Sequence, residues 1–179
     1  MTTVDNNPGN VSRLKNVIRA GEDPSGGWGK GQRFSIFEDL GSGYRGLFRD
    51  LRIKLSGRSR AANFKPLNTL RKLFPVYAPE SENDTEAYIN SVADELGIGP
   101  DEPIPDNDDA VRDLGLAITK YEKGPGYSGL EDFDAINEGF YTSGYNIPDK
   151  DVPSLGGIEQ IIKYIVDNGL KPDFGPDVV

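Results

Sequence analysis

The chain has 179 residues, 36% of them hydrophobic, a net charge of −9, and neither cysteine nor histidine. This composition excludes disulfides, thiol and imidazole catalysis, and the usual zinc and iron sites, so acid–base chemistry would have to come from carboxylates, lysine or tyrosine. We expect no cofactor and no metal, although a cation site built from oxygen ligands stays open. The length predicts one domain, or one domain with an appendage. No apolar run is long enough for a membrane span or a signal peptide.

The charge is divided unevenly along the chain. Residues 1–79 hold 14 Lys and Arg against 6 Asp and Glu, whereas residues 80–179 hold 6 against 23. One interpretation is that the two halves attract each other within one fold. The other is that the basic half faces an anionic polymer. The sequence pI of about 4.6 argues against nucleic acid, and the glycan strands of a bacterial wall suit a mixed surface better.

The first forty residues are predicted to be mostly loop. The segment "DNNPGN" (5–10) is rich in turn-forming residues with hydrogen-bonding side chains. The next segment, "VSRLKNVI" (11–18), fits either a short strand or a helical turn. The loop "AGEDPSGGWGKG" (20–31) contains Trp28, the only tryptophan. After it, "RFSIFED" (33–39) predicts a short strand with Phe34 and Ile36 directed inward, although Phe37 breaks the alternation.

Hydrophobic spacing then predicts a series of helices. The first runs from Tyr44 to Leu55, the second roughly from Leu67 to Tyr77, the third follows "SENDT" and stops at Gly97, and the fourth starts near Asp108 and ends at "EKGPG" (122–126). For the third helix, either Asn83 or Asp84 is the expected N-cap. The fold class is therefore mainly α, a small helical domain with a few short strands.

The C-terminal part predicts two further helices. In "LEDFDAINEGF" (130–140) the inward positions are expected at Leu130, Phe133, Ile136 and Phe140. A helix over 154–168, capped by Ser154, carries an apolar stripe of Leu155, Ile158, Ile161, Ile162 and Ile165. We expect residues 125–179 to be an extension for docking or assembly rather than a domain with its own core, because its apolar residues are too few.

Residues 1–123 contain several motifs that occur together in one known family. They are "NNPGNV" (6–11), "GGWGKGQRFSIF" (26–37), "GYRGLFRDL" (43–51), "YAPESENDTEAYINSVADELGI" (77–98) and "AITKYEKG" (117–124). With these motifs the chain resembles a family common among tailed phages and prophages. Its members are described as virion or structural proteins and sometimes as cell-wall lytic enzymes. The resemblance implies a location in the virion, synthesis in the host cytoplasm and action at the host wall or periplasm.

The same motifs are also similar, in rotated order, to those of wall-cutting glucosaminidases of the lysozyme superfamily. In that family a helix ends in the catalytic Glu, an asparagine loop follows, and a "YAT....Y" segment with a substrate-facing Tyr comes later. Here "NNPGNV" corresponds to the asparagine loop, "YAPESENDTEAY" (77–88) to the Tyr segment, and the end of "AITKYEKG" to the Glu-bearing helix. A circular permutation would explain this order. The resemblance implies an α+β, lysozyme-like domain over residues 1–124.

The candidate site follows from this resemblance. Glu122 is the expected general acid, at a helix C-terminus where the dipole disfavours an anion and would help to raise its pKa. The expected substrate-binding residues are Asn6, Asn7, Asn10, Trp28, Tyr77 and Tyr88. The alternative for Glu122 is a solvated carboxylate beside Lys120 and Lys123. The asparagines would then stabilise a turn, Trp28 would cover the core, and the tyrosines would belong to the core.

A glycosidase also needs a second carboxylate, unless the substrate supplies its own nucleophile. Glu22, Asp23, Glu38 and Asp39 are candidates, and none stands out. A single acid would suit a lytic transglycosylase or a substrate-assisted glucosaminidase, and the sequence does not separate these two.

The sequence thus predicts a phage virion-associated protein with a peptidoglycan-cleaving, lysozyme-like domain. Its expected partners are glycan strands and other virion proteins, with no nucleic acid and no membrane span, and a homo-oligomer within the particle is compatible with this function. The alternative is a non-catalytic tail or capsid component that keeps the fold. The acidic surface and the "KGPG" turn (123–126), which lacks the serine of active relatives, favour that alternative. A third hypothesis is a small module that inhibits a host factor, for which Glu122 would lie on an open, convex surface.

Overall fold

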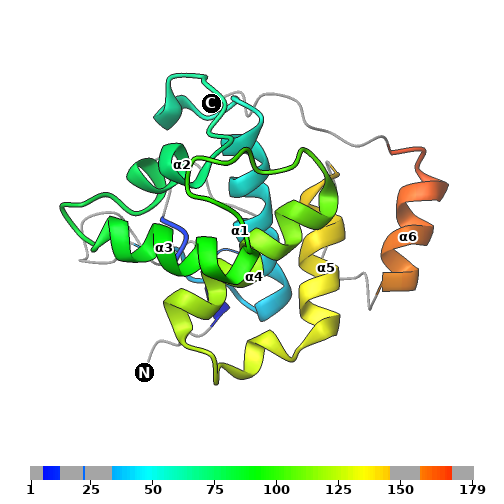
Figure 1. Cartoon of the computed structure of the whole chain (residues 1–179). Coiled ribbons are helices and arrows are strands. Elements are labelled where there is room, and N and C mark those ends of the chain that lie inside the picture. The colour runs from blue at the N-terminus through cyan, green and yellow to red at the C-terminus, as the bar shows by residue number, and fades with distance from the viewer. Residues whose placement is uncertain (1–5, 13–21, 23–33, 146–157, 171–179) are drawn as a thin grey trace.

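The computed structural model describes residues 6–12, 22, 34–145 and 158–170. In these residues the architecture is mainly helical, as the sequence predicts, with α helices arranged around α1 (Figure 1). In chain order the elements are α1 (Leu40–Leu55), η2 (Arg60–Ala62), α2 (Leu70–Tyr77), α3 (Thr85–Leu96), α4 (Asp108–Lys123), η3 (Ser128–Leu130), α5 (Phe133–Ser143) and α6 (Ile158–Asp167). Of the described helices, none is both long and apolar enough to cross a membrane.

Side-chain caps fix where the helices begin. The Asp39 carboxylate accepts a hydrogen bond of 2.7 Å from the backbone N–H of Ser42, so α1 starts four residues before the predicted Tyr44. Asp84, not Asn83, caps α3, and Gly97 ends that helix in the left-handed conformation with a φ of 65°. Asn107 caps α4. The expected Ser154 cap and residues 154–157 of the last predicted helix lie outside the described residues.

The prediction of a strand over 33–39 is wrong in its described part. Residues 34–39 make only isolated bridges, which pair Phe34 with Ser12 and Phe37 with Glu22. Ser35 and Phe37 are buried there, while Phe34 and Ile36 are only partly buried. Phe37 faces inward against the alternation because its ring packs on Gly46. The contact is so close that a Cβ on this glycine would come within 2.6 Å of the ring. Beyond residue 12, the ambiguous segment 11–18 is outside the described residues.

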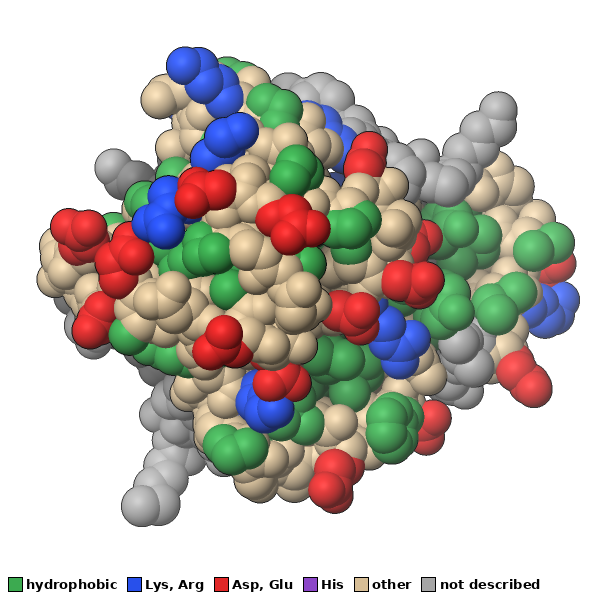
Figure 2. All heavy atoms as spheres, in the orientation of Figure 1, with side chains coloured by type: hydrophobic (Ala, Val, Ile, Leu, Met, Phe, Trp, Pro, Cys, Tyr) green, Lys and Arg blue, Asp and Glu red, His purple; other side chains and the backbone are tan. Residues whose placement is uncertain are grey.

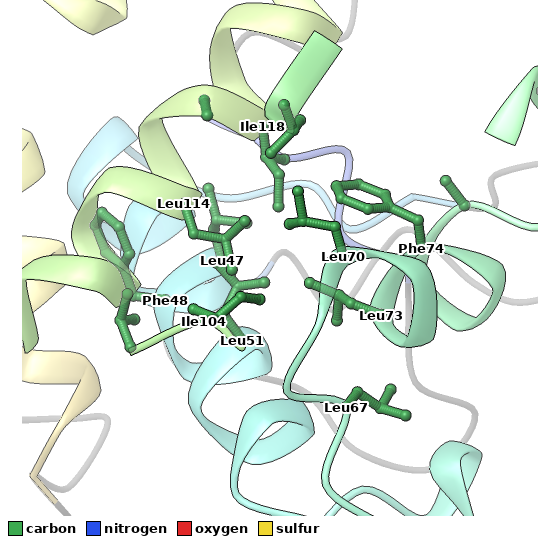
Figure 3. Packing of buried hydrophobic residues seen from close by; sticks show 14 of the residues in the cluster. Leu47, Phe48, Leu51, Leu67, Leu70, Leu73, Phe74, Ile104, Leu114 and Ile118 are labelled. Carbon is green, nitrogen blue, oxygen red and sulfur yellow. The ribbon is translucent and has the colours of Figure 1, made fainter. Parts of the chain in front are cut away.

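One hydrophobic cluster contains residues of helices α1, α2, α3, α4 and α5, and Figure 3 shows part of it. Its fully buried members include Tyr44, Leu47, Phe48, Leu51, Leu70, Leu73, Phe74, Tyr88, Leu114, Ile118 and Ile136. The ring of Phe48 on α1 meets the ring of Phe140 on α5 edge-to-face, with centroids 5.3 Å apart.

A division into 1–124 and 125–179 stays a prediction, but α5, which follows residue 124, packs against α1. The prediction that Phe133 faces inward is wrong, because that side chain is 66% exposed.

The last described helix, α6, packs on α5 (Figure 1). Ile161 is fully buried there, against Tyr145, Tyr164, Ile165 and Leu170. Ile162, which was expected in the same stripe, is 48% exposed.

Ion pairs connect the basic and acidic parts of the chain. Arg52 reaches Asp108 at 2.6 Å, and Arg71 reaches Glu86 at 2.8 Å and Asp101 at 3.2 Å. These pairs support the interpretation that the two oppositely charged halves attract each other within one fold.

Candidate functional site

The opening loop, residues 6–12, is fixed by two asparagine side chains. The Asn7 amide nitrogen donates to the carbonyl oxygens of Ser35 and Val11 at 2.8 and 3.1 Å, and its oxygen accepts from the Val11 N–H at 2.8 Å. The Asn6 amide donates to the carbonyl oxygens of Phe37 and Glu38 at 3.2 and 3.1 Å. Both side chains therefore satisfy backbone groups, as the turn-stabilising alternative predicts. Asn7 is also fully buried, so it does not line a sugar site in this structure.

Two glycines let this loop lie directly on the helices. A Cβ at Gly43 of α1 would sit 1.8 Å from the carbonyl oxygen of Asn6, which leaves room only for glycine. A Cβ at Gly9 would come within 2.5 Å of the Leu47 side chain and 2.8 Å of the Tyr77 hydroxyl oxygen. The Tyr77 hydroxyl itself donates to the Gly9 carbonyl oxygen at 2.5 Å. Tyr77 thus holds the loop against the end of α2.

Glu122 lies where this loop meets α3 and α4. Its Oε2 accepts from the Asn10 amide at 2.5 Å, and its Oε1 accepts from the Tyr88 hydroxyl at 2.8 Å. Lys123 Nζ donates to the Asn10 amide oxygen at 2.9 Å. The Asn10 amide therefore uses both of its ends, the nitrogen on the anion and the oxygen on the cation, which fixes its orientation. These four side chains, Asn10, Tyr88, Glu122 and Lys123, are called the Glu122 cluster below.

Aromatic packing holds the Tyr88 hydroxyl in place. The Tyr88 ring lies between Phe74, at a centroid distance of 4.4 Å, and Tyr121, at 3.8 Å. Burial, with Tyr77 and Glu122 nearby, raises the pKa of Tyr88 above its ordinary value. Tyr88 is therefore a neutral hydrogen-bond donor at physiological pH. Because its side chain is fully buried, the expectation that Tyr88 contacts a glycan is wrong for this structure; Tyr88 positions Glu122 instead.

The structure thus brings together part of the predicted site. Asn10, Tyr88 and Glu122 are hydrogen-bonded to one another, and Tyr77 lies next to them through Gly9. Asn6 and Asn7 stabilise the loop from its other side, and Trp28 lies outside the described residues. Lys123 belongs to the cluster but was considered only as a solvating neighbour of Glu122. The available signal was the position of Lys123 directly after Glu122 in the chain.

The exposure of Glu122 separates the hypotheses further. Glu122 is partly buried and tied to two distant segments, so it does not lie on the open, convex surface that an inhibitory module would require. Among the candidates for a second carboxylate, Asp39 caps α1, Glu22 is buried, Glu38 is exposed, and Asp23 is outside the described residues. Within the described residues, no group of three or more acidic side chains could hold a metal ion.

Each oxygen of Glu122 accepts one hydrogen bond from the protein. For a substrate group to take the place of one of these donors, that donor has to move. Asn10 is the one that can move, because it is partly buried on a loop, whereas Tyr88 is fixed in the core.

The chain matches no protein-family model and no curated protein.

Proposed function

We propose that the protein is a virion-associated protein of a tailed phage and that its helical domain cleaves the glycan strands of peptidoglycan during cell-wall penetration. The observation that carries this proposal is the meeting of Asn10, Tyr88 and Glu122 at one partly buried carboxylate. The three residues come from the three segments that resemble the asparagine loop, the Tyr segment and the Glu-bearing helix end of the glucosaminidases. A permuted lysozyme-like domain predicts that these segments meet.

In this proposal Glu122 protonates the glycosidic oxygen through Oε2. Tyr88 keeps Oε1 in place, and Asn10 moves from Oε2 to a polar group of the substrate. Lys123, which follows Glu122 in the chain, stays near the carboxylate after the Asn10 amide has moved. The nucleophile is water or a hydroxyl or acetamido group of the substrate, which corresponds to a glycosidase, a lytic transglycosylase or a substrate-assisted glucosaminidase.

A second candidate function is a non-catalytic virion component that keeps the fold for docking. The observation in its favour is that each oxygen of Glu122 already has a donor from the protein. Such a carboxylate ties the loop, α3 and α4 together without any reaction. In addition, the pocket described between α3 and α4 is lined by residues outside the Glu122 cluster.

Purified peptidoglycan separates the two functions. The wild type, Glu122→Gln and the matched control Glu131→Gln, which changes an exposed glutamate, are compared by turbidity loss and by zymogram. Mass spectrometry of the fragments then identifies the bond that is cut. We expect the wild type and Glu131→Gln to release fragments and Glu122→Gln to release none, with all three melting cooperatively.

A folded wild type that releases nothing would favour the non-catalytic component. Activity that persists in Glu122→Gln would mean an enzyme with a different acid.

A further inference from the structure

The loop that follows α1 presents an aromatic side chain to solvent. Phe64 is 63% exposed, and both Asn63 and Phe64 have left-handed backbone, with φ values of 51° and 56°. A bulky residue rarely adopts this conformation, because its Cβ then crowds the backbone. Strain of this kind persists only where the surrounding structure enforces it, and it is frequent at functional surfaces.

Backbone hydrogen bonds hold this loop in one shape. The N–H of Phe64 donates to the Ser59 carbonyl oxygen at 3.0 Å, and the N–H of Leu67 donates to that of Lys54 at 3.1 Å. Phe64 is therefore held on a fixed loop. When a partner binds Phe64, little conformational entropy is lost in ordering this loop.

The surroundings of Phe64 are basic. Residues 51–79 contain no Asp or Glu, and Arg60 and Lys65 are exposed on either side of Phe64 in the chain. Figure 2 shows several Lys and Arg side chains toward the upper left of the visible face, while other Lys and Arg side chains and the Asp and Glu side chains are spread over it. Arg60, Phe64 and Lys65 are called the basic tip below. Phe133 is as exposed as Phe64 but lies between Asp132 and Asp134, so its surroundings carry the opposite charge.

A surface pocket with complementary properties lies between α3, α4 and η3. Its volume is about 260 Å³, and Leu96, Leu116 and Leu130 give it an apolar lining. An apolar cavity of about 150 Å³ holds a benzene molecule, so an aromatic ring fits. Glu95 and Asp113 line the same pocket. Lys120 lines the pocket too and pairs with Glu95 at 2.6 Å, whereas Asp113 is exposed on α4.

The basic tip and the Leu130 side of this pocket lie toward different ends of α1. The tip follows the C-terminal end of α1, while η3, which contributes Leu130, is bound near its start, where the Tyr44 hydroxyl donates to the Gly129 carbonyl oxygen at 2.8 Å. The 16 residues of α1 span about 24 Å. Figure 1 shows the loop after α1 at the top of the molecule and the segment with η3 near its lower end. The tip therefore lies away from the Leu130 side of the pocket of its own chain.

We propose that the basic tip of one copy of this chain docks in the α3–α4 pocket of a second copy. Phe64 enters the apolar lining, Arg60 and Lys65 face Asp113, and Glu95 keeps its ion pair with Lys120. A second copy is the favoured partner because the same chain carries both complementary surfaces, while its net charge of −9 opposes binding to nucleic acid or to an anionic membrane. The contact joins two different surfaces, so it is heterologous and propagates head to tail into a ring or a filament.

Sedimentation velocity over a concentration series from micromolar to millimolar tests this proposal. We expect the wild type to associate with rising concentration, more weakly at high salt because the ion pairs are exposed. Phe64→Ala removes the ring from the tip, and Asp113→Arg reverses the charge in the pocket. Neither variant should associate with itself. The matched controls Phe133→Ala and Glu159→Arg remove an exposed phenylalanine ring and reverse an exposed acidic charge elsewhere, and should associate like the wild type. Melting curves establish that each variant is folded.

A mixture of the two deficient variants gives the decisive measurement. Phe64→Ala keeps an intact pocket and Asp113→Arg keeps an intact tip, so together they should form a dimer and nothing larger. A wild type that stays monomeric would overturn the proposal, as would association that survives either variant or a mixture that stays monomeric. Phe64-dependent binding to anionic vesicles or to single-stranded DNA by a monomeric wild type would overturn it in favour of that partner.

Discussion

Asn10 and Glu122 are 112 residues apart in the chain, and a hydrogen bond of 2.5 Å joins the Asn10 amide to Glu122 Oε2. This bond attaches the opening loop to the C-terminal end of α4. A hydrogen bond to a charged group contributes about 1.5–3 kcal/mol to stability. The position of the loop therefore depends on one amide as well as on the hydrogen bonds of Asn6 and Asn7.

The first prediction concerns Asn10→Gly. Asn10 has a positive φ of 46°, and glycine adopts that backbone without strain, so the substitution removes the amide and little else. We expect the free energy of unfolding to fall by about 1.5–3 kcal/mol, measured by urea denaturation. Asn63→Gly is the matched control, because Asn63 has a similar φ of 51° and an exposed side chain. Equal losses in the two variants would contradict a specific role for the Asn10 amide.

The second prediction concerns Tyr88→Phe, which keeps the ring between Phe74 and Tyr121 but removes the donor to Glu122 Oε1. We expect a loss of about 1.5–3 kcal/mol in the free energy of unfolding. In a double-mutant cycle with Glu122→Gln, the coupling energy should exceed 0.5 kcal/mol, as it does for residues in contact. Tyr121→Phe, a change on an exposed tyrosine of the same stack, is the control and should show no coupling.

The helices were predictable because each has a local signal in the sequence. Asp84 and Gly97 mark the two ends of α3, and apolar spacing marks the buried face of α1. The strand prediction failed because burial of residues 34–37 is decided by Gly46 and Val11, which lie on other segments. Similarly, Phe133 fits the helical spacing but sits in the first turn of α5, beyond the reach of the core.

Only part of the candidate site could be predicted for the same reason. A resemblance in motif order pointed to Asn10, Tyr88 and Glu122, which lie together, and also to Asn6, Asn7, Tyr77 and Trp28. It did not distinguish contact with a ligand from support of the loop, because that difference depends on burial and on donor directions. Asn7 and Tyr88 are buried. The helical spacing of Tyr88 with Val92 and Leu96 fits the buried face of α3, whereas no comparable spacing marks Asn7.

The third prediction concerns the seat of the opening loop on α1. Gly43→Ala would place a methyl group 1.8 Å from the Asn6 carbonyl oxygen, so the loop or the helix has to move. We expect the free energy of unfolding to fall by about 3 kcal/mol, and the amide of Val11 to lose hydrogen-exchange protection. Gly126→Ala, at a glycine with open space around it, is the control and should change stability by less than about 0.5 kcal/mol. A neutral Gly43→Ala would contradict the described contact.

The fourth prediction concerns the attachment of α6. Ile161 is fully buried between α6 and its neighbours, whereas Ile162 is 48% exposed. We expect Ile161→Ala to lower the hydrogen-exchange protection of α6 by about 2 kcal/mol or more, with a smaller change in the main melting transition. Ile162→Ala is the control and should leave the protection of α6 nearly unchanged. Similar effects of the two variants would mean that α6 is not held through Ile161.

The last prediction concerns stability at alkaline pH. Burial, with smaller contributions from Tyr127 and Asp132, raises the pKa of Tyr44 above its ordinary value of 10.0. The unfolded chain therefore releases the Tyr44 proton near pH 10, while the folded protein keeps it. Since stability falls with pH wherever the folded state binds more protons, this tyrosine stabilises the fold fully below pH 10 and progressively less above it. The contribution to the slope is about −1.4 kcal/mol per pH unit.

Tyr44→Phe should remove that slope. The variant loses the hydrogen bond to the Gly129 carbonyl oxygen, so we expect it to be about 1 kcal/mol less stable at neutral pH. Above pH 10 the wild type should approach the variant, because only the wild type pays the growing cost of keeping the proton. Urea denaturation at several pH values from 8 to 11 measures both slopes, and Tyr141→Phe, at an exposed tyrosine, should keep the wild-type slope. Parallel curves for the wild type and Tyr44→Phe would mean that the Tyr44 hydroxyl ionises in the folded protein as readily as in the unfolded chain.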